Sequence, residues 1–236
     1  MKRFLLGGLI AIVAAGSASA ADMPLKAPPA PVMAPTWTGT YIGINGGYAW
    51  SRSNLRNDGP GGLTSGDFDI KGGLAGVTYG GNWQAGHVVL GFESDFDWAH
   101  INGNTGAIAV CGGVAPGCET DTKWFSTERM RAGWDFDGWL LYGTGGAAFA
   151  DVRSFIGTCG PGTCGDRTRV GWTAGVGLET MFWHNWSAKI EYLHYDLGRD
   201  IMFNGGPGLP ISSTERGDMV RAGINYHFDL MNLLHF

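Results

Sequence analysis

Apolar and polar residues alternate with a period of two over much of this sequence, starting near Thr38. Successive side chains of a strand point to opposite faces, so this period predicts strands with two different environments. The alternation is regular in 41–50, 87–98, 170–178, 186–192 and 220–228, and looser in about 70–82, 123–136 and 138–153. The sequence therefore predicts eight strands.

The connections between these segments distinguish a soluble β-sandwich from a membrane barrel, since both folds bury one face of each strand. Three connections are tight, at 84–86, 135–138 and 182–185. Four are long and rich in Gly, Pro, Asn and Asp, at 51–69, 101–122, 156–167 and 197–216. Long and short connections alternate strictly, as loops and turns do on the two sides of an outer-membrane barrel. We therefore predict an all-β fold, an eight-stranded antiparallel transmembrane β-barrel that runs as an up-and-down meander.

Aromatic residues gather at the predicted strand ends, which suits the two interfacial girdles of such a barrel. They are Trp37, Tyr41, Trp50, Trp83, Trp98, Trp124, Trp134, Trp139, Trp183 and Trp186. After the N-terminal segment no run of 18 apolar residues occurs, so no helical span is expected.

The first 20 residues have the form of a secretory signal peptide, with Lys2 and Arg3, an apolar stretch at 4–15 and small residues at 18–20. We predict cleavage after Ala20, a proline-rich periplasmic linker at 21–36, and a barrel over 37–236 in the cell outer membrane. Removing Lys2 and Arg3 leaves 14 of 16 basic residues against 21 acidic ones, a net charge of −7. This balance argues against a nucleic-acid partner, which needs clustered cations.

The predicted non-lipid face carries charges of both signs. The acidic members are Glu93, Asp95, Asp97, Glu179 and Glu191, and the basic members are Arg129, Arg131, Lys189 and Arg221. An eight-stranded barrel is just wide enough for side chains to fill it, and charges removed from water must pair. We therefore interpret these nine residues as a structural ion-pair network inside the barrel. The alternative is a conducting path.

Glu128 breaks this pattern, because it faces the lipid if its neighbours Arg129 and Arg131 face inward. A charge at mid-depth is costly. Glu128 either lies near the outer rim, is re-aimed by a bulge, or pairs with another protein. The rim placement costs least.

The four cysteines fall in two of the long connections, and an exported protein favours disulfides. Four cysteines allow three connectivities. We predict the local pairs Cys111–Cys118 and Cys159–Cys164, each within one connection. The rival is a four-cysteine zinc site, but the spacings are C-x6-C and C-x4-C rather than C-x2-C.

No catalytic, cofactor-binding or metal site is predicted. The six histidines form no close ligand pair, and no serine lies in a G-x-S-x-G elbow. His194 with a nearby serine is a weaker alternative, a lipid-hydrolysing dyad. Nothing in the sequence selects the serine.

Five segments resemble a known family. They are WTGTYIGINGGY at 37–48, ERMRAGW at 128–134, LYGTGG at 141–146, GWTAGVGLE at 171–179 and WSAKIEYLHYDLG at 186–198. They resemble alphaproteobacterial outer-membrane barrels, often called porin-family or outer-membrane immunogenic proteins. The resemblance spans about 37–228 and implies an opacity-type, OmpA-like barrel that is surface-exposed and has no known catalytic site.

Two features depart from that family. Glu128 stands where the family usually has an apolar residue. The C-terminal aromatic that assists barrel assembly is either Phe228 or Phe236, and the sequence leaves both open.

The leading functional hypothesis is a structural and surface-interaction protein that supports envelope integrity and displays antigen-like or adhesin-like loops. The expected partners are outer-membrane lipid, the barrel assembly machinery, and a host or surface ligand at the loops. The alternatives are a small-solute porin and a lipid-modifying outer-membrane enzyme.

Overall fold

The computed structural model describes residues 36–59, 61–106, 111, 117–157, 162–204 and 210–228. These residues form eight strands: β1 (Gly39–Asn57), β2 (Phe68–Ala85), β3 (Val88–Asn104), β4 (Cys118–Phe136), β5 (Trp139–Ile156), β6 (Cys164–Trp183), β7 (Trp186–Asn204) and β8 (Pro210–Phe228). Within these ranges no helix is long and apolar enough to cross a membrane. The predicted signal peptide, nearly all of the predicted linker, and Phe236 lie outside the described residues.

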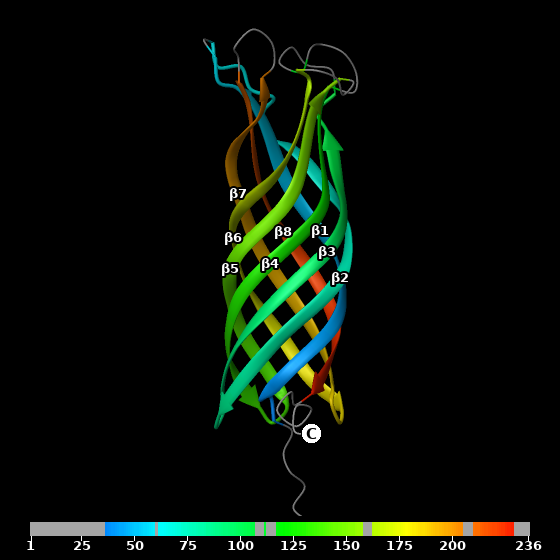
Figure 1. Ribbon diagram of the computed structural model, residues 1–236, viewed down its shortest axis with the longest axis vertical. Coiled ribbons are helices and arrows are strands. Elements are labelled where there is room, and N and C mark those ends of the chain that lie inside the picture. Colours follow the sequence, from blue (N-terminus) through cyan, green and yellow to red (C-terminus); the bar gives the residue numbers. More distant parts are fainter. Residues whose placement is uncertain are drawn as a thin grey trace, which may run out of the picture. The chain divides into compact units, whose positions relative to one another are not determined.

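The strands close into a barrel, because each pairs antiparallel with its sequence neighbours and β1 also pairs with β8 (Figure 1). Paired residues followed once around the barrel run through Tyr41, Gly80, Glu93, Arg129, Gly146, Thr173, Tyr195, Gly217 and Ser51. The path returns to β1 ten residues from its start, at Ser51 instead of Tyr41. With the usual strand spacing and rise, that stagger tilts the strands by about 40°. The predicted fold class is confirmed.

The three tight turns fall where the sequence predicts them, between β2 and β3, β4 and β5, and β6 and β7. Asp137 and His184 adopt positive φ in two of these turns, beside Gly138 and Asn185. The long connections are shorter than predicted, because the strands continue to Asn57, Asn104 and Asn204. Most of the predicted loop 197–216 is strand.

Two rings of outward-facing aromatic residues border the membrane-facing zone. The outer ring consists of Tyr48, Trp50, Trp98, Trp124 and Trp172, and the inner ring of Trp83, Trp134, Phe136, Trp139, Trp183 and Trp186. Between the rings lie exposed apolar side chains such as Ile44, Val77 and Ile190. Such a band between two aromatic girdles is the outer surface of a transmembrane barrel.

Beyond the outer ring the hydropathy of the two faces is exchanged. On β1, Arg52 and Arg56 point outward, whereas Leu55 is buried inside. Ile70 and Ile101 are likewise buried on β2 and β3. The outer wall there meets water and the interior becomes an apolar core, as in a soluble barrel. Because of this exchange, apolar residues no longer mark the outward face there, and the alternation in the sequence is weaker.

Candidate functional site: the barrel interior

The nine charged residues predicted to face inward all lie buried inside the barrel, between the two aromatic rings. They come from five strands: Glu93, Asp95 and Asp97 from β3, Arg129 and Arg131 from β4, Glu179 from β6, Lys189 and Glu191 from β7, and Arg221 from β8. Because the alternation is regular, all nine side chains point into the lumen. The ten-residue stagger places residues from strands on opposite sides of the barrel at similar depths.

Arg129 joins three carboxylates. Its Nη2 lies 2.5 Å from Glu93 Oε1 and 2.6 Å from Asp95 Oδ2, and its Nη1 lies 3.2 Å from Glu191 Oε1. All four side chains are at most 1% exposed. Charge-assisted hydrogen bonds of this kind are what allow ionised groups to remain buried.

Arg221 and Lys189 connect the same carboxylates from the opposite wall. Arg221 donates to Asp95 and Asp97 at 2.9 Å each and to Glu191 at 3.0 Å. Lys189 Nζ lies 2.7 Å from Glu93 Oε2. The cations therefore cross-link strands β3, β7 and β8 through the centre of the barrel.

Arg131 lies among aromatic rings nearer the inner ring. It donates to Glu179 at 2.6 Å, and its guanidinium lies 4.3 Å from the centroid of Tyr142. Tyr41 donates its hydroxyl to Glu93 and Tyr142 donates its hydroxyl to Glu191, both at 2.8 Å. Both tyrosines occupy inward-facing positions of the period-two alternation, and this is the sequence signal that could have identified them.

The inward glycines make room for these rings. A Cβ at Gly80 would collide with the Tyr41 ring, and one at Gly177 with the Tyr142 ring. Tyr41 was predicted to lie in a girdle, and that prediction is wrong: it is fully buried. Its register with Gly43 and Asn45, rather than with Ile42, places it on the inner face.

Trp37 is also not a girdle residue, because it closes the inner mouth of the barrel. Its side chain is fully buried, and its Nε1 donates to Asp135 at 3.1 Å. It packs edge-on against His227, with ring centroids 5.9 Å apart, and clusters with Val89, Leu140 and Tyr142. Because Trp37 precedes β1, period-two alternation gives no information about its direction.

The opposite end of the lumen is filled by an apolar core. Its larger members are Leu55, Phe68, Ile70, Ile101, Phe125, Leu193 and Tyr195. The expectation of a polar interior is therefore correct between the aromatic rings. Above the outer ring the interior combines these large apolar side chains with buried polar residues such as Thr120, Arg169 and Glu215.

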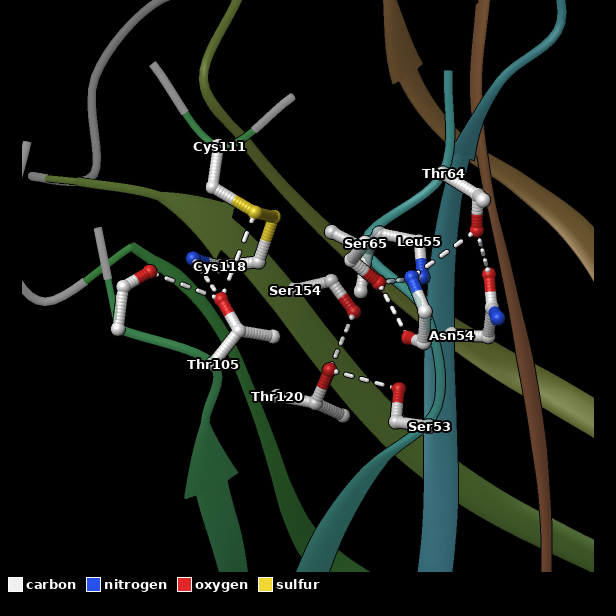
Figure 2. Close-up of a disulfide and its surroundings, with 12 residues drawn as sticks. Ser53, Asn54, Leu55, Thr64, Ser65, Thr105, Cys111, Cys118, Thr120 and Ser154 are labelled. Carbon is white, nitrogen blue, oxygen red and sulfur yellow. Dashed lines mark hydrogen bonds between the residues drawn. A yellow bond between two sulfur atoms is a disulfide. The ribbon is translucent and has the colours of Figure 1, made fainter. Parts of the chain in front are cut away.

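A short hydrogen-bond chain and a disulfide lie at the top of this core (Figure 2). Thr120 on β4 contacts Ser53 of β1 at 3.0 Å and Ser154 of β5 at 3.3 Å. Cys111 is bonded to Cys118, as predicted, and both are buried in the apolar core. Their sulfurs are therefore not available as zinc ligands. The predicted Cys159–Cys164 pair includes Cys159, which lies outside the described residues.

Glu215 of β8 is a buried carboxylate above the outer ring. It pairs in register with Ser53, three residues beyond Trp50, and its side chain is fully buried. Burial raises the pKa of Glu215 to about 7. The positive charge of Arg169 and the hydroxyls of Thr122 and Tyr195 counteract part of this rise. Arg169 itself is buried and donates to the backbone carbonyls of Leu197 and Ser213.

Glu128 points outward, between the two aromatic rings. It pairs in regular register with Ser94 and Ala147, and Ser94 donates its hydroxyl to the Glu128 carboxylate at 2.6 Å. It lies four residues from Trp124, about 10 Å lower at the strand rise and tilt given above. The rim placement is therefore wrong, because β4 already begins at Cys118. The bulge placement is also wrong, since the irregularity lies between Thr122 and Phe125.

His194 lies on the outer wall and contacts a carboxylate. Its Nδ1 is 2.9 Å from Asp218 Oδ1, which also accepts the Tyr192 hydroxyl at 2.6 Å. Within the part of the chain that the structure describes, no serine hydroxyl is bonded to His194, and no cluster of three metal-ligating side chains occurs.

Comparison with known proteins agrees with this architecture. A family model described as the outer membrane protein beta-barrel domain matches residues 8–228. The 31 kDa outer-membrane immunogenic protein of Brucella melitensis is 37% identical over 246 residues, covering 97% of this chain and 100% of that protein. The 22 kDa outer membrane protein of Rhizobium leguminosarum bv. viciae is 32% identical over 162 residues, covering 68% of this chain and 64% of that protein.

Among solved structures, the outer membrane protein AlkL shares 14% identity with a TM-score of 0.48, covering 88% of this chain and 98% of that one. Neisserial surface protein A shares 12% identity with a TM-score of 0.44, covering 81% and 98%. The family match spans all eight strands, and the relatives are outer-membrane proteins, so the predicted family and location are confirmed. This chain belongs to the outer membrane protein β-barrel domain family.

Proposed function

We propose that the protein is a non-conducting membrane anchor that stiffens the outer membrane and presents its loops at the cell surface. The observation that carries this proposal is the filled lumen. The Trp37 side chain closes the inner mouth of the barrel, and the charge network fills the middle of the lumen. The apolar core occupies its outer end. The proposal includes no catalytic step.

The charge network favours a scaffold over a small-solute porin. A pore needs water along its axis, and ions that bind weakly enough to leave. Here Arg129, Arg221 and Lys189 each contact two or more carboxylates, and none of these side chains is more than 1% exposed. Opening such a path would require breaking several buried ion pairs together, which is costly.

Single-channel recording in a planar bilayer tests the proposal. We expect no stable conductance from the folded barrel, with a large general porin as the positive control. Trp37→Ala removes one of the three layers and is expected to stay silent, because the other two remain. Reproducible ohmic steps from the unaltered chain would overturn the filled-lumen account.

The surface role has a separate test. The relative in Brucella melitensis is named as immunogenic, which supports loops that are reachable from outside. Replacing residues 61–66 of the first long connection by a Gly-Ser segment should reduce binding of antisera to intact cells while the barrel still folds. Unchanged binding by sera raised against the folded protein would exclude this loop as a displayed epitope.

A further inference from the structure

Two polar groups interrupt the outer surface of the barrel at or below the outer aromatic ring. The first is the Glu128 carboxylate of β4 with the Ser94 hydroxyl of β3, whose oxygens lie 2.6 Å apart. The second is the His194 imidazole of β7 with the Asp218 carboxylate of β8, joined at 2.9 Å. Polar side chains that face lipid are costly, and in membrane proteins they usually pair with one another.

Each group keeps a polar atom that has no hydrogen-bond partner within the described part of its own chain. Ser94 donates to Oε1 of Glu128, which leaves Oε2. Asp218 binds Nδ1 of His194, which leaves Nε2 on the other side of the imidazole ring. A carboxyl group and an imidazole share one proton in a hydrogen bond, with either of them as the donor. The Glu128 side and the His194 side of the barrel are therefore chemically complementary.

The two groups lie on opposite sides of the barrel. In the closed ring, β7 lies four strands from β3 in either direction, and β8 lies four strands from β4. One chain therefore cannot bring the two groups together. When two upright copies meet through these two sides, the ring order sets β3 against β8 and β4 against β7. Glu128 of one copy then faces His194 of the neighbouring copy.

The strand stagger also places these two residues at similar depths. Arg129 and Tyr195 lie on one path of paired residues, and the stagger places Tyr195 about four residues nearer the outer end. Glu128 is one residue nearer that end than Arg129, and His194 is one residue further from it than Tyr195. Glu128 and His194 therefore differ in depth by about two residues, or about 5 Å at the strand rise and tilt given above. Their side chains are long enough to span this difference.

Small side chains surround Glu128 on the outer surface. Ser94 is its partner on β3, Ala147 is its partner on β5, and Ser126 is the next outward residue of β4. Small residues are typical of places where membrane-spanning elements approach closely. The wall beside the carboxylate therefore has room for the imidazole of a neighbour.

We propose that copies of this protein assemble side by side in the outer membrane, with Glu128 of one copy hydrogen-bonded to His194 of the next. The contact joins two different sides of the barrel, so each copy offers its remaining side to a further neighbour. Head-to-tail contacts through opposite sides do not close into a ring, and they continue as open rows. This assembly does not require a closed lumen, so its failure would be distinct from a failure of the scaffold role.

Chemical cross-linking between two kinds of full-length chain in lipid vesicles tests this arrangement. In chains whose four cysteines are replaced by serine, one kind carries Phe96→Cys on β3 and the other Val220→Cys on β8. Both positions face outward, and the stagger places them at nearly equal depths on the facing sides. The reagent is a short, membrane-permeant bismaleimide that spans the spacing of about 10 Å between packed sheets.

We expect cross-linked dimers from the mixture of the two chains and few from either chain alone. The matched control is a mixture of Val77→Cys and Val176→Cys chains. These exposed positions lie on β2 and β6, which are also opposite each other but at a right angle to the proposed contact. Gel mobility with and without boiling verifies that each chain is folded.

Glu128→Leu tests the direction of the contact. In the Phe96→Cys chain, whose β3–β4 side makes the cross-linked contact, it removes the hydrogen bond. We expect about tenfold weaker association, measured as dimer yield at a low ratio of protein to lipid. In the Val220→Cys chain the same substitution lies on the side away from the cross-link and should leave the yield unchanged. Met130→Leu, on the same outward face of β4, should have no effect in either chain.

A dimer yield in the mixture no higher than that of the control pair would overturn the proposal. Dimers from the Phe96→Cys chain alone would overturn it in favour of a symmetric contact between two β3–β4 sides. An equal loss from Glu128→Leu in either chain, or no loss in both, would show that Glu128 does not bind His194 of the next copy.

Discussion

Arg129→Met is the change that most directly probes the charge network. The substitution keeps a long apolar side chain but removes the group that contacts Glu93, Asp95 and Glu191. The network has five carboxylates and four cations, so three cations would remain to compensate five buried carboxylates. Breaking a buried ion pair costs about 3–5 kcal/mol, and we expect a loss of that size in the free energy of unfolding.

Urea unfolding in phospholipid vesicles, followed by tryptophan fluorescence, measures this loss as a shift of the midpoint at constant slope. The exposed Lys123→Met is the matched control and should change stability by less than about 0.5 kcal/mol. Adding Glu93→Gln to Arg129→Met restores the balance of charge and should recover part of the loss. If Arg129→Met unfolds within the range of the control, the network does not stabilise the barrel.

Three further predictions concern single groups. Because burial raises the pKa of Glu215 to about 7, its stabilising contribution is complete below the unfolded value near 4.3 and is lost as pH rises to 7. Glu215→Gln should therefore stabilise the barrel relative to the parent at pH 8 but not at pH 4; an equal effect at both pH values contradicts this. Glu128→Leu removes a charge from the lipid-facing band and should raise the free energy of unfolding in vesicles by about 1–2 kcal/mol. A loss of stability would show instead that the Ser94–Glu128 hydrogen bond dominates. Cys118→Ser should lower stability by about 2–3 kcal/mol in oxidising buffer and by nothing when dithiothreitol is present throughout. An equal loss in both buffers would assign the effect to packing.

The part of the fold between the two aromatic rings is well predicted by the sequence. Ile42 and Ile44 alternate with Gly43 and Asn45, and this alternation persists because lipid faces one side and the polar lumen the other. The same register places Glu93 and Arg129 opposite each other on β3 and β4. Alternation with known strand order was therefore enough to bring the charged residues together.

The strands above the outer ring were harder to predict, because the polar face changes from the inside to the outside. On β1, Trp50 and Arg52 both point outward, yet one faces the interface and the other water. If every outward side chain of a strand is expected to face lipid, a polar outward residue beside the buried Leu55 predicts a loop and not a strand. The predicted long connections were therefore too long.

Residues outside the alternating segments carry no directional signal. Trp37 lies before β1, and only its contacts with Asp135 and His227 reveal that it closes the mouth. The depth of Glu215 relative to the outer aromatic ring likewise depends on the ten-residue stagger of the strands. No local pattern in the sequence encodes this stagger.

Solvent access at the middle of the lumen tests the central claim most directly. In a chain whose four cysteines are replaced by serine, Thr127→Cys places a thiol beside Asp95, where Thr127 is fully buried. Thr64→Cys, on the exposed first long connection, is the reference. A small charged thiol reagent should modify the Thr64 variant at once and the Thr127 variant only after unfolding. Rapid modification of the folded Thr127 variant would show a water-filled lumen and contradict the account.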